Sequence, residues 1–188
     1  MTLSSTVSAL VAAQVDMQPT VDASGPAAYA WLLFVVPGVV AAILLLFGRR
    51  TDGWGHWLAV GASWFSFLLG SVILLQLLQA GPGERRLVTH LGSWMPAGNF
   101  QVSFGTLIDP LSMTFVMLVT LVGSLILVYS VGYMENDPDR RRFFAYLALF
   151  IASMLVLVLG DSYATLFLGW EGVGLSSYLL IGFWNQVP

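Results

Sequence analysis

The chain has 188 residues, of which 57% are hydrophobic and 9% are charged, with a formal net charge of −3. A soluble domain usually carries about 25% charged residues, so this composition excludes an ordinary cytosolic enzyme and a disordered tail. The chain has no cysteine and no lysine. It therefore cannot hold a disulfide framework, an iron–sulfur cluster or a thiolate metal site. The negative charge also argues against nucleic-acid binding. The sequence predicts an integral membrane protein.

The N-terminal segment, residues 1–30, contains a short apolar stretch that no basic residue precedes. A secretory signal needs a basic region at its start, so this segment does not fit one. We expect it to be an exposed, poorly ordered lead-in to a transmembrane domain that covers residues 31–188.

Five apolar runs are close to the length of about 20 residues that a helix needs to cross a bilayer. They are continuous, unlike the short alternating strands of a membrane barrel. Pro37 lies within the first run and should kink that helix, which membrane helices tolerate when a neighbour satisfies the freed carbonyl. The predicted helices cover residues 27–48, 57–78, 111–133, 143–160 and 163–184.

The long loop between the second and third predicted helices has the pattern of a strand. Apolar residues alternate with polar ones from Phe100 to Phe104, and turn-forming residues precede them. We expect a small β-hairpin on the outer face, in which residues 90–95 pair with residues 100–105. The Asp109–Pro110 pair is typical of a helix start and should open the third helix.

The arginines predict how the chain is oriented. Arg49 and Arg50 follow the first helix, and Arg140, Arg141 and Arg142 precede the fourth, so five arginines share one side. The other two lie on the opposite side. Because basic residues favour the cytoplasmic side, we expect the N-terminus outside and Pro188 inside. The protein would be a multi-pass protein of the cell (inner) membrane.

Glu171 is the one acidic residue deep within a predicted span. It is the ninth residue of the fifth helix, which places it near the middle of the bilayer. A charged group at that depth costs roughly 2.5–3.5 kcal/mol on insertion scales, so burial favours the protonated form. Intramembrane carboxyl groups are rare and usually functional. We interpret Glu171 as a proton-relay residue; the alternative is a protonated side chain that joins two helices.

Four neighbours of Glu171 are candidate supporting residues. Tyr178 shares its helix face and could extend a proton path, and Trp170 is adjacent. Ser176 and Ser177 can donate hydrogen bonds, although serine hydroxyls in membrane helices often bond to their own backbone. Gly172 and Ser176 form a pair of small residues that lets another helix approach closely.

No metal or cofactor site is expected on this chain. His56 and His90 lie outside the predicted spans, and no carboxylates accompany them at ligand spacing. We interpret both as ordinary interfacial or loop residues. No nucleotide-binding motif is present.

The string from Gly169 to Phe183, GWEGVGLSSYLLIGF, closely resembles the fifth-helix signature of subunit L of respiratory complex I, the proton-pumping NADH:quinone oxidoreductase. The segments DPLSM at residues 109–113 and RFFAY at residues 142–146 fit the same family. The resemblance runs from about residue 109 to residue 188, and more loosely back to the first helix.

This resemblance implies a fold and a role. The family has a core of fourteen helices built around two inverted five-helix repeats. It forms part of the membrane arm, carries no redox centre and conducts protons. The glutamate at the position of Glu171 works there with lysines of later helices. The chain would thus be a non-redox subunit that is not catalytic alone, with no cofactor of its own and with the antiporter-like subunit M as neighbour.

Alternatives remain open because the family is several times longer than this chain. We interpret the chain as an N-terminal portion of such a subunit, truncated relative to the family. It could instead be a structural or assembly fragment without its own proton path. A third reading is an antiporter-like subunit of a related cation/proton antiporter or membrane hydrogenase.

Overall fold

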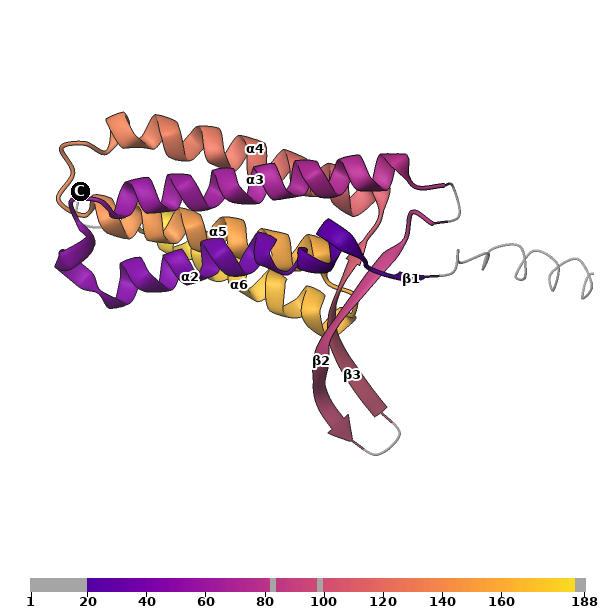
Figure 1. Ribbon diagram of the computed structural model, residues 1–188. Helices are drawn as coiled ribbons and strands as arrows, with labels where there is room; N and C mark the ends of the chain where they lie inside the picture. The colour runs from indigo at the N-terminus through magenta and orange to yellow at the C-terminus, as the bar shows by residue number, and fades with distance from the viewer. Residues whose placement is uncertain (1–19, 82–83, 98–99, 185–188) are drawn as a thin grey trace, which may run out of the picture.

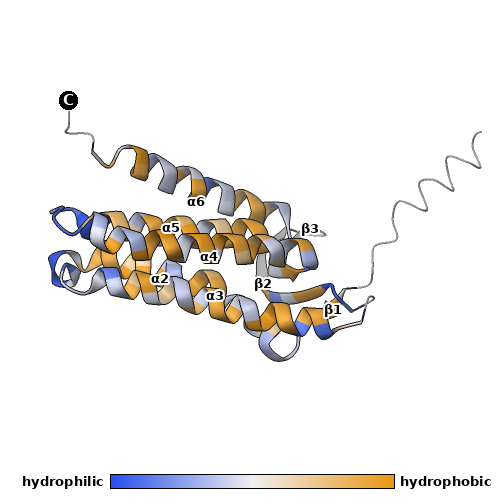
Figure 2. Ribbon diagram, turned by 90° about the horizontal axis from the view of Figure 1, so that it is seen from above, coloured by the Kyte–Doolittle hydropathy of each residue, from blue (hydrophilic) through white to orange (hydrophobic). Residues whose placement is uncertain are grey.

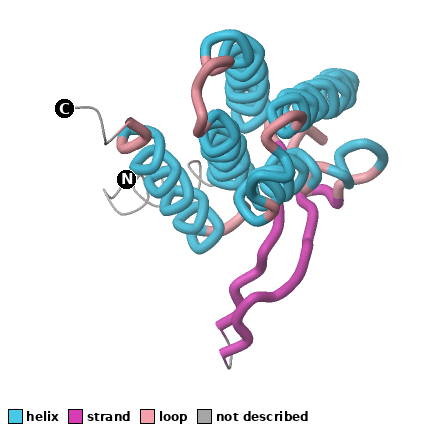
Figure 3. Tube along the Cα trace, turned by 90° about the vertical axis from the view of Figure 1, so that its left-hand side faces the viewer, coloured by secondary structure: helices cyan, strands magenta, loops and turns pink. Residues whose placement is uncertain are grey.

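A computed structural model describes residues 20–81, 84–97 and 100–184. Within them, five helical segments are long and apolar enough to cross a membrane, which confirms the five predicted spans. The helices lie side by side as a bundle, and α5 packs against each of the other four (Figures 1 and 3). Apolar residues dominate the helices, and hydrophilic residues gather at the ends of the bundle (Figure 2). The helices are α2 (Leu32–Leu46), α3 (Gly55–Gln79), α4 (Pro110–Tyr133), α5 (Arg140–Leu159) and α6 (Tyr163–Ile181).

Each span differs from its predicted bounds by one to three residues at one or both ends. The fourth begins at Arg140 rather than at residue 143, because three arginines form its first turn. Arginine is a good helix former, and its long side chain can reach the polar boundary while its backbone stays helical. The first span begins with the 3-10 helix η1 (Gly25–Tyr29) and continues as α2.

Most of residues 20–30 are exposed, as predicted, but the prediction that they are poorly ordered is wrong. Strand β1 (Val21–Asp22) pairs with the sheet, and Ala27 of η1 is fully buried. Gln76 of α3 holds this segment: its Oε1 accepts from the Ala27 amide at 3.0 Å, and its Nε2 donates to the Ser24 carbonyl at 2.9 Å. These are long-range contacts that local composition does not reveal. The rest of that prediction, residues 1–19, lies outside the described residues.

A hairpin connects α3 and α4, as predicted, but it is longer than expected and belongs to a three-stranded sheet. Strands β2 (Leu87–Ala97) and β3 (Phe100–Ile108) pair antiparallel, with His90 opposite Gly105. Strand β1 adds in parallel to the start of β2, so the order is β1-β2-β3. The hairpin extends away from one end of the bundle (Figure 1). Its base is buried there, because Ile108 is fully covered.

The start of α4 confirms the helix-start pattern. Asp109 accepts a hydrogen bond from the Ser112 amide at 2.7 Å, and the Ser112 hydroxyl accepts one from the Asp109 amide at 2.9 Å. This reciprocal capping box satisfies two backbone donors at the helix terminus.

Pro37 lies inside α2, and a neighbouring helix compensates for it. Proline has no amide hydrogen, so the carbonyl four residues earlier, that of Leu33, loses its helical partner. The hydroxyl of Ser66, on α3, donates to the Leu33 carbonyl at 2.8 Å. Both residues are fully buried. The expectation that a neighbour satisfies the freed carbonyl is therefore confirmed.

A second buried contact joins α3 to α4. The hydroxyl oxygens of Ser63 and Ser124 lie 2.7 Å apart, and both residues are buried. In a bilayer, hydroxyl pairs of this kind help to join helices that the hydrophobic effect alone would not hold together.

The contact at Pro37 gives a prediction about stability. Ser66→Ala should destabilise the folded chain by about 1–2 kcal/mol, because the Leu33 carbonyl is left without a donor. Pro37→Ala restores an amide hydrogen that can bond to Leu33, so Ser66→Ala should cost much less in that background. The measurement is the loss of folded protein on titration with SDS for both single variants and the double variant. An equal cost of Ser66→Ala in the two backgrounds would contradict this assignment.

Candidate functional site on helix α6

Helix α6 is held at both ends. At its start, Ser162 accepts a hydrogen bond from the Thr165 amide at 3.3 Å. The preceding residue, Asp161, accepts one from the amide of Gly105 in β3 at 3.0 Å, which ties the helix start to the sheet. Beyond its other end, Trp184 donates through Nε1 to Asp137 in the loop between α4 and α5, at 3.0 Å. The height of α6 relative to the bundle is therefore fixed by two other segments, strand β3 and the loop between α4 and α5.

Gly105 is required where the sheet meets this helix start. A Cβ atom at this position would lie 2.4 Å from Asp161 Oδ2 and 2.5 Å from the Thr89 carbonyl oxygen. No side chain fits in that space, so only glycine allows Asp161 to reach the backbone of β3.

Small residues form the face of α6 that packs against α5. A Cβ at Gly169 would lie 2.5 Å from the backbone nitrogen of Leu157, and one at Gly172 would lie 2.5 Å from the Ser153 hydroxyl oxygen. Ser176 is fully buried on the same face. The predicted close approach of another helix at Gly172 and Ser176 is confirmed, and the approaching helix is α5.

Glu171 lies on the opposite, outward face of α6. Eight residues of the helix precede it and ten follow it, so it is close to the middle of the span. Its side chain is exposed, and it makes no hydrogen bond or ion pair with the described residues. Helix α6 lies at the edge of the bundle (Figure 2). In its apolar 18-residue stretch, 17% of the residues are buried, against 33–50% in the corresponding stretches of the other spans. The charged face of α6 thus has no packing partner among the described helices.

The candidate supporting residues divide between the two faces. Tyr178 and Trp170 are 74% and 66% exposed, and Tyr178 shares the face of Glu171 as expected. Ser176 instead donates to the backbone carbonyl of Gly172 at 2.7 Å, so its hydroxyl is engaged within its own helix and faces α5. Ser177 is half-buried and belongs to neither group.

Between Glu171 and Tyr178 the outward face is open. A Cβ atom at Gly174 would have no neighbouring atom within 4 Å. Water or a polar side chain from another segment could occupy this space, next to both the carboxyl and the phenol group.

The interpretation of His56 as a residue outside the spans is wrong. It is the second residue of α3 and is 6% exposed. The predicted span began at residue 57, two residues after the start of α3. His90 lies exposed in β2. In the described part of the chain, no three metal-ligating side chains come together.

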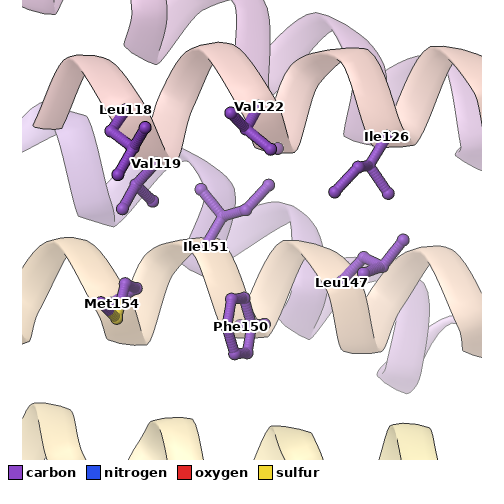
Figure 4. Close-up of a pocket in the computed structure, with 9 residues that line it drawn as sticks. Leu118, Val119, Val122, Ile126, Leu147, Phe150, Ile151 and Met154 are labelled. Carbon is purple, nitrogen blue, oxygen red and sulfur yellow. The ribbon is translucent and has the colours of Figure 1, made fainter. Parts of the chain in front are cut away.

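An apolar groove between α4 and α5 carries no proton chemistry. It has a volume of about 340 Å³, and side chains such as Val122, Ile126, Leu147 and Met154 line it (Figure 4). None of the lining residues is titratable, so the groove is no alternative to the site on α6.

Sequence reasoning missed Asp161. Its partner, Gly105, lies 56 residues earlier, and no local pattern links the two. The available signal was a polar Asp161–Ser162 pair between two apolar spans, which marks a helix start but does not identify a contact with the sheet.

Comparisons with known proteins agree on one family. Residues 94–144 match the family model described as NADH-ubiquinone oxidoreductase (complex I), chain 5 N-terminus. Subunit L of NADH-quinone oxidoreductase from Mycobacterium tuberculosis (strain ATCC 25618 / H37Rv) is 56% identical over 160 residues, or 85% of this chain and 25% of that protein. The Escherichia coli (strain K12) subunit L is 40% identical over 158 residues, covering 83% and 25%. NADH-ubiquinone oxidoreductase chain 5 of Chondrus crispus is 45% identical over 147 residues, covering 75% and 22%.

A solved structure supports the fold. A chain of the membrane-bound sulfane sulfur reductase, an archaeal respiratory membrane complex, matches with a TM-score of 0.68 and 16% sequence identity. The match covers 80% of this chain and 29% of that one. This chain spans about a quarter of the length of the curated relatives it matches. The chain belongs to the family of subunit L and chain 5 of NADH-quinone oxidoreductase, and it matches the N-terminal portion of that family.

Proposed function

We propose that this chain is part of a proton-translocating membrane-arm subunit of NADH:quinone oxidoreductase, and that Glu171 carries the proton. The observation that supports this most is an unpartnered carboxyl group at mid-span, on the one face of α6 that the described helices leave open. The relatives named as subunits of that enzyme support the choice of complex. The electron-transfer chemistry belongs to other subunits, and the chain itself carries no cofactor.

The mechanism rests on the cost of charge in the membrane. Near the bilayer centre the protonated carboxyl is favoured over the carboxylate. Glu171 can therefore release its proton when water or a cationic group approaches its open face and stabilises the carboxylate, and it can take up a proton again when that group withdraws. Tyr178, on the same face, would extend the hydrogen-bonded path. The rigid attachment of α6 at both ends keeps Glu171 at constant depth, so what changes is the carboxyl's surroundings.

The proposal extends to the partner of this subunit and to its orientation in the membrane. The open face of α6 needs further helices, and the neighbouring antiporter-like subunit M is the proposed partner of the whole subunit in the cell (inner) membrane. We also propose that the arginine-rich end of the bundle faces the cytoplasm and that the sheet lies outside, since five of the seven arginines lie at that end.

Glu171→Gln in the complete enzyme should lower the number of protons pumped per NADH oxidised, because glutamine cannot carry the proton. NADH oxidation by the peripheral arm should persist. The measurement is proton uptake into membrane vesicles alongside NADH oxidation. The matched control is Glu135→Gln, the same chemical change in the exposed loop after α4, which should leave pumping unchanged.

Two outcomes would contradict this role. Normal pumping in the Glu171 variant would remove Glu171 from the proton path. A lower amount of assembled complex with normal pumping per complex would instead support the structural or assembly role. Soluble subunits of a hydrogenase that co-purify with the chain would point to that related complex.

The orientation can be tested with single cysteines, because the chain has none of its own. Asp139→Cys marks the arginine-rich end and Glu84→Cys marks the sheet end; both residues are exposed. In intact cells, a membrane-impermeant maleimide should label the cysteine at position 84 and leave the one at position 139 unlabelled. The reverse labelling pattern would overturn the proposed orientation.

A further inference from the structure

Among the described residues, two buried nitrogen atoms at the arginine-rich end of the bundle have no hydrogen-bond partner. They are Nδ1 of His56 and Nε of Arg140. Both side chains contact the same ring: the centroid of the His56 ring is 5.9 Å from that of Phe144, and Arg140 Cζ is 5.9 Å from the Phe144 centroid. Buried polar atoms nearly always have a hydrogen-bond partner. Two unpartnered nitrogens beside one ring therefore point to an oxygen ligand.

The charges around this corner favour an anionic ligand. Arg141 is paired with Asp52 at 3.0 Å, and Arg142 lies 3.5 Å from Asp139. Arg140 makes no ion pair with any described residue, and it is close enough to His56 to act on it electrostatically. Asp52 and Asp139 are thus engaged by other arginines, and Asp137 accepts a hydrogen bond from the Trp184 indole. The Arg140 charge remains available.

Two helix N-termini reinforce this positive potential. His56 lies in the first turn of α3, and Arg140 is the first residue of α5. Neither helix start is capped by the side chain of its N-cap residue, Trp54 or Asp139. Helix N-termini attract anions through their free amide groups and the helix dipole.

Exposed aromatic residues indicate the depth of this corner in the membrane. Trp57 is 61% exposed, and its ring centroid is 5.3 Å from that of His56; Trp54 is 51% exposed. Tryptophans at the ends of membrane helices lie at the level of the lipid headgroups. The ligand that reaches the corner at this level is a lipid headgroup.

We infer that Arg140 and His56 bind the phosphate of an anionic phospholipid. The Arg140 guanidinium supplies the charge, His56 supplies a second hydrogen bond, and Phe144 holds both side chains in place. Basic pockets between membrane helices on the cytoplasmic side bind anionic headgroups in this way. The site is separate from Glu171, and its role does not depend on proton transport.

The test is a cryo-electron microscopy map of the intact complex in nanodiscs of phosphatidylglycerol. The wild type should show headgroup density between Arg140 and His56, and Arg140→Gln should remove it. The control is Arg50→Gln, which removes the same charge from an exposed arginine at the same end of the bundle and should retain the density. His56→Leu, which removes the second contact but no arginine, should weaken it.

Binding supplies a second readout. After delipidation, the affinity of the complex for phosphatidylglycerol at this site should fall about ten-fold or more in Arg140→Gln, as expected when a hydrogen bond between charged groups is lost, and by less in Arg50→Gln. Equal losses in Arg140→Gln and Arg50→Gln would reduce the effect to general electrostatics and overturn the site. A carboxylate of a neighbouring subunit between the two side chains, a water molecule there, or no density in the wild type would overturn it as well.

Discussion

The structure depends on one constraint: in the hydrocarbon core, a backbone polar group has no water to bind and needs a partner within the protein. The helices satisfy nearly all of these groups themselves. Where the sequence breaks a helix, another helix supplies the missing partner, as Ser66 does for the Leu33 carbonyl beside Pro37. The polar contacts between helices therefore lie where the backbone or a buried hydroxyl requires them.

The same constraint makes Glu171 conspicuous. Glycines on the opposite face of α6 let that helix pack closely on α5, and the sheet and the loop after α4 hold its two ends. The described residues give the carboxyl group no partner, although it is the charge deepest in any span. A carboxyl group in that position needs either a proton or an approaching polar group, and alternation between the two is what proton transfer requires.

Sequence reasoning predicted the features that have a local physical signal. Apolar length gave all five spans, the Asp109–Pro110 pair gave the start of α4, and small residues at helical spacing gave the packed face of α6. The position of Tyr178 on the same face as Glu171 followed from helical spacing as well, whereas the outward exposure of that face did not. These signals are local because helix formation in a membrane depends on continuous apolar length.

Contacts between distant segments were not predictable in this way. The bonds from Gln76 to the segment around Ala27 order residues that look like a lead-in, and Asp161 reaches Gly105 across 56 residues. The burial of His56 depends on Phe144 in another helix. Each of these contacts can be identified only from the packed structure, because neither residue of the pair has a sequence pattern that identifies the other.

The central claim is that Glu171 changes its protonation state while the enzyme works. Infrared difference spectroscopy of the intact complex, with and without NADH turnover, measures this directly. The account predicts a reversible carboxylic C=O band that is present in the wild type and absent from Glu171→Gln. A difference spectrum in which the two proteins have the same carboxyl bands would contradict it.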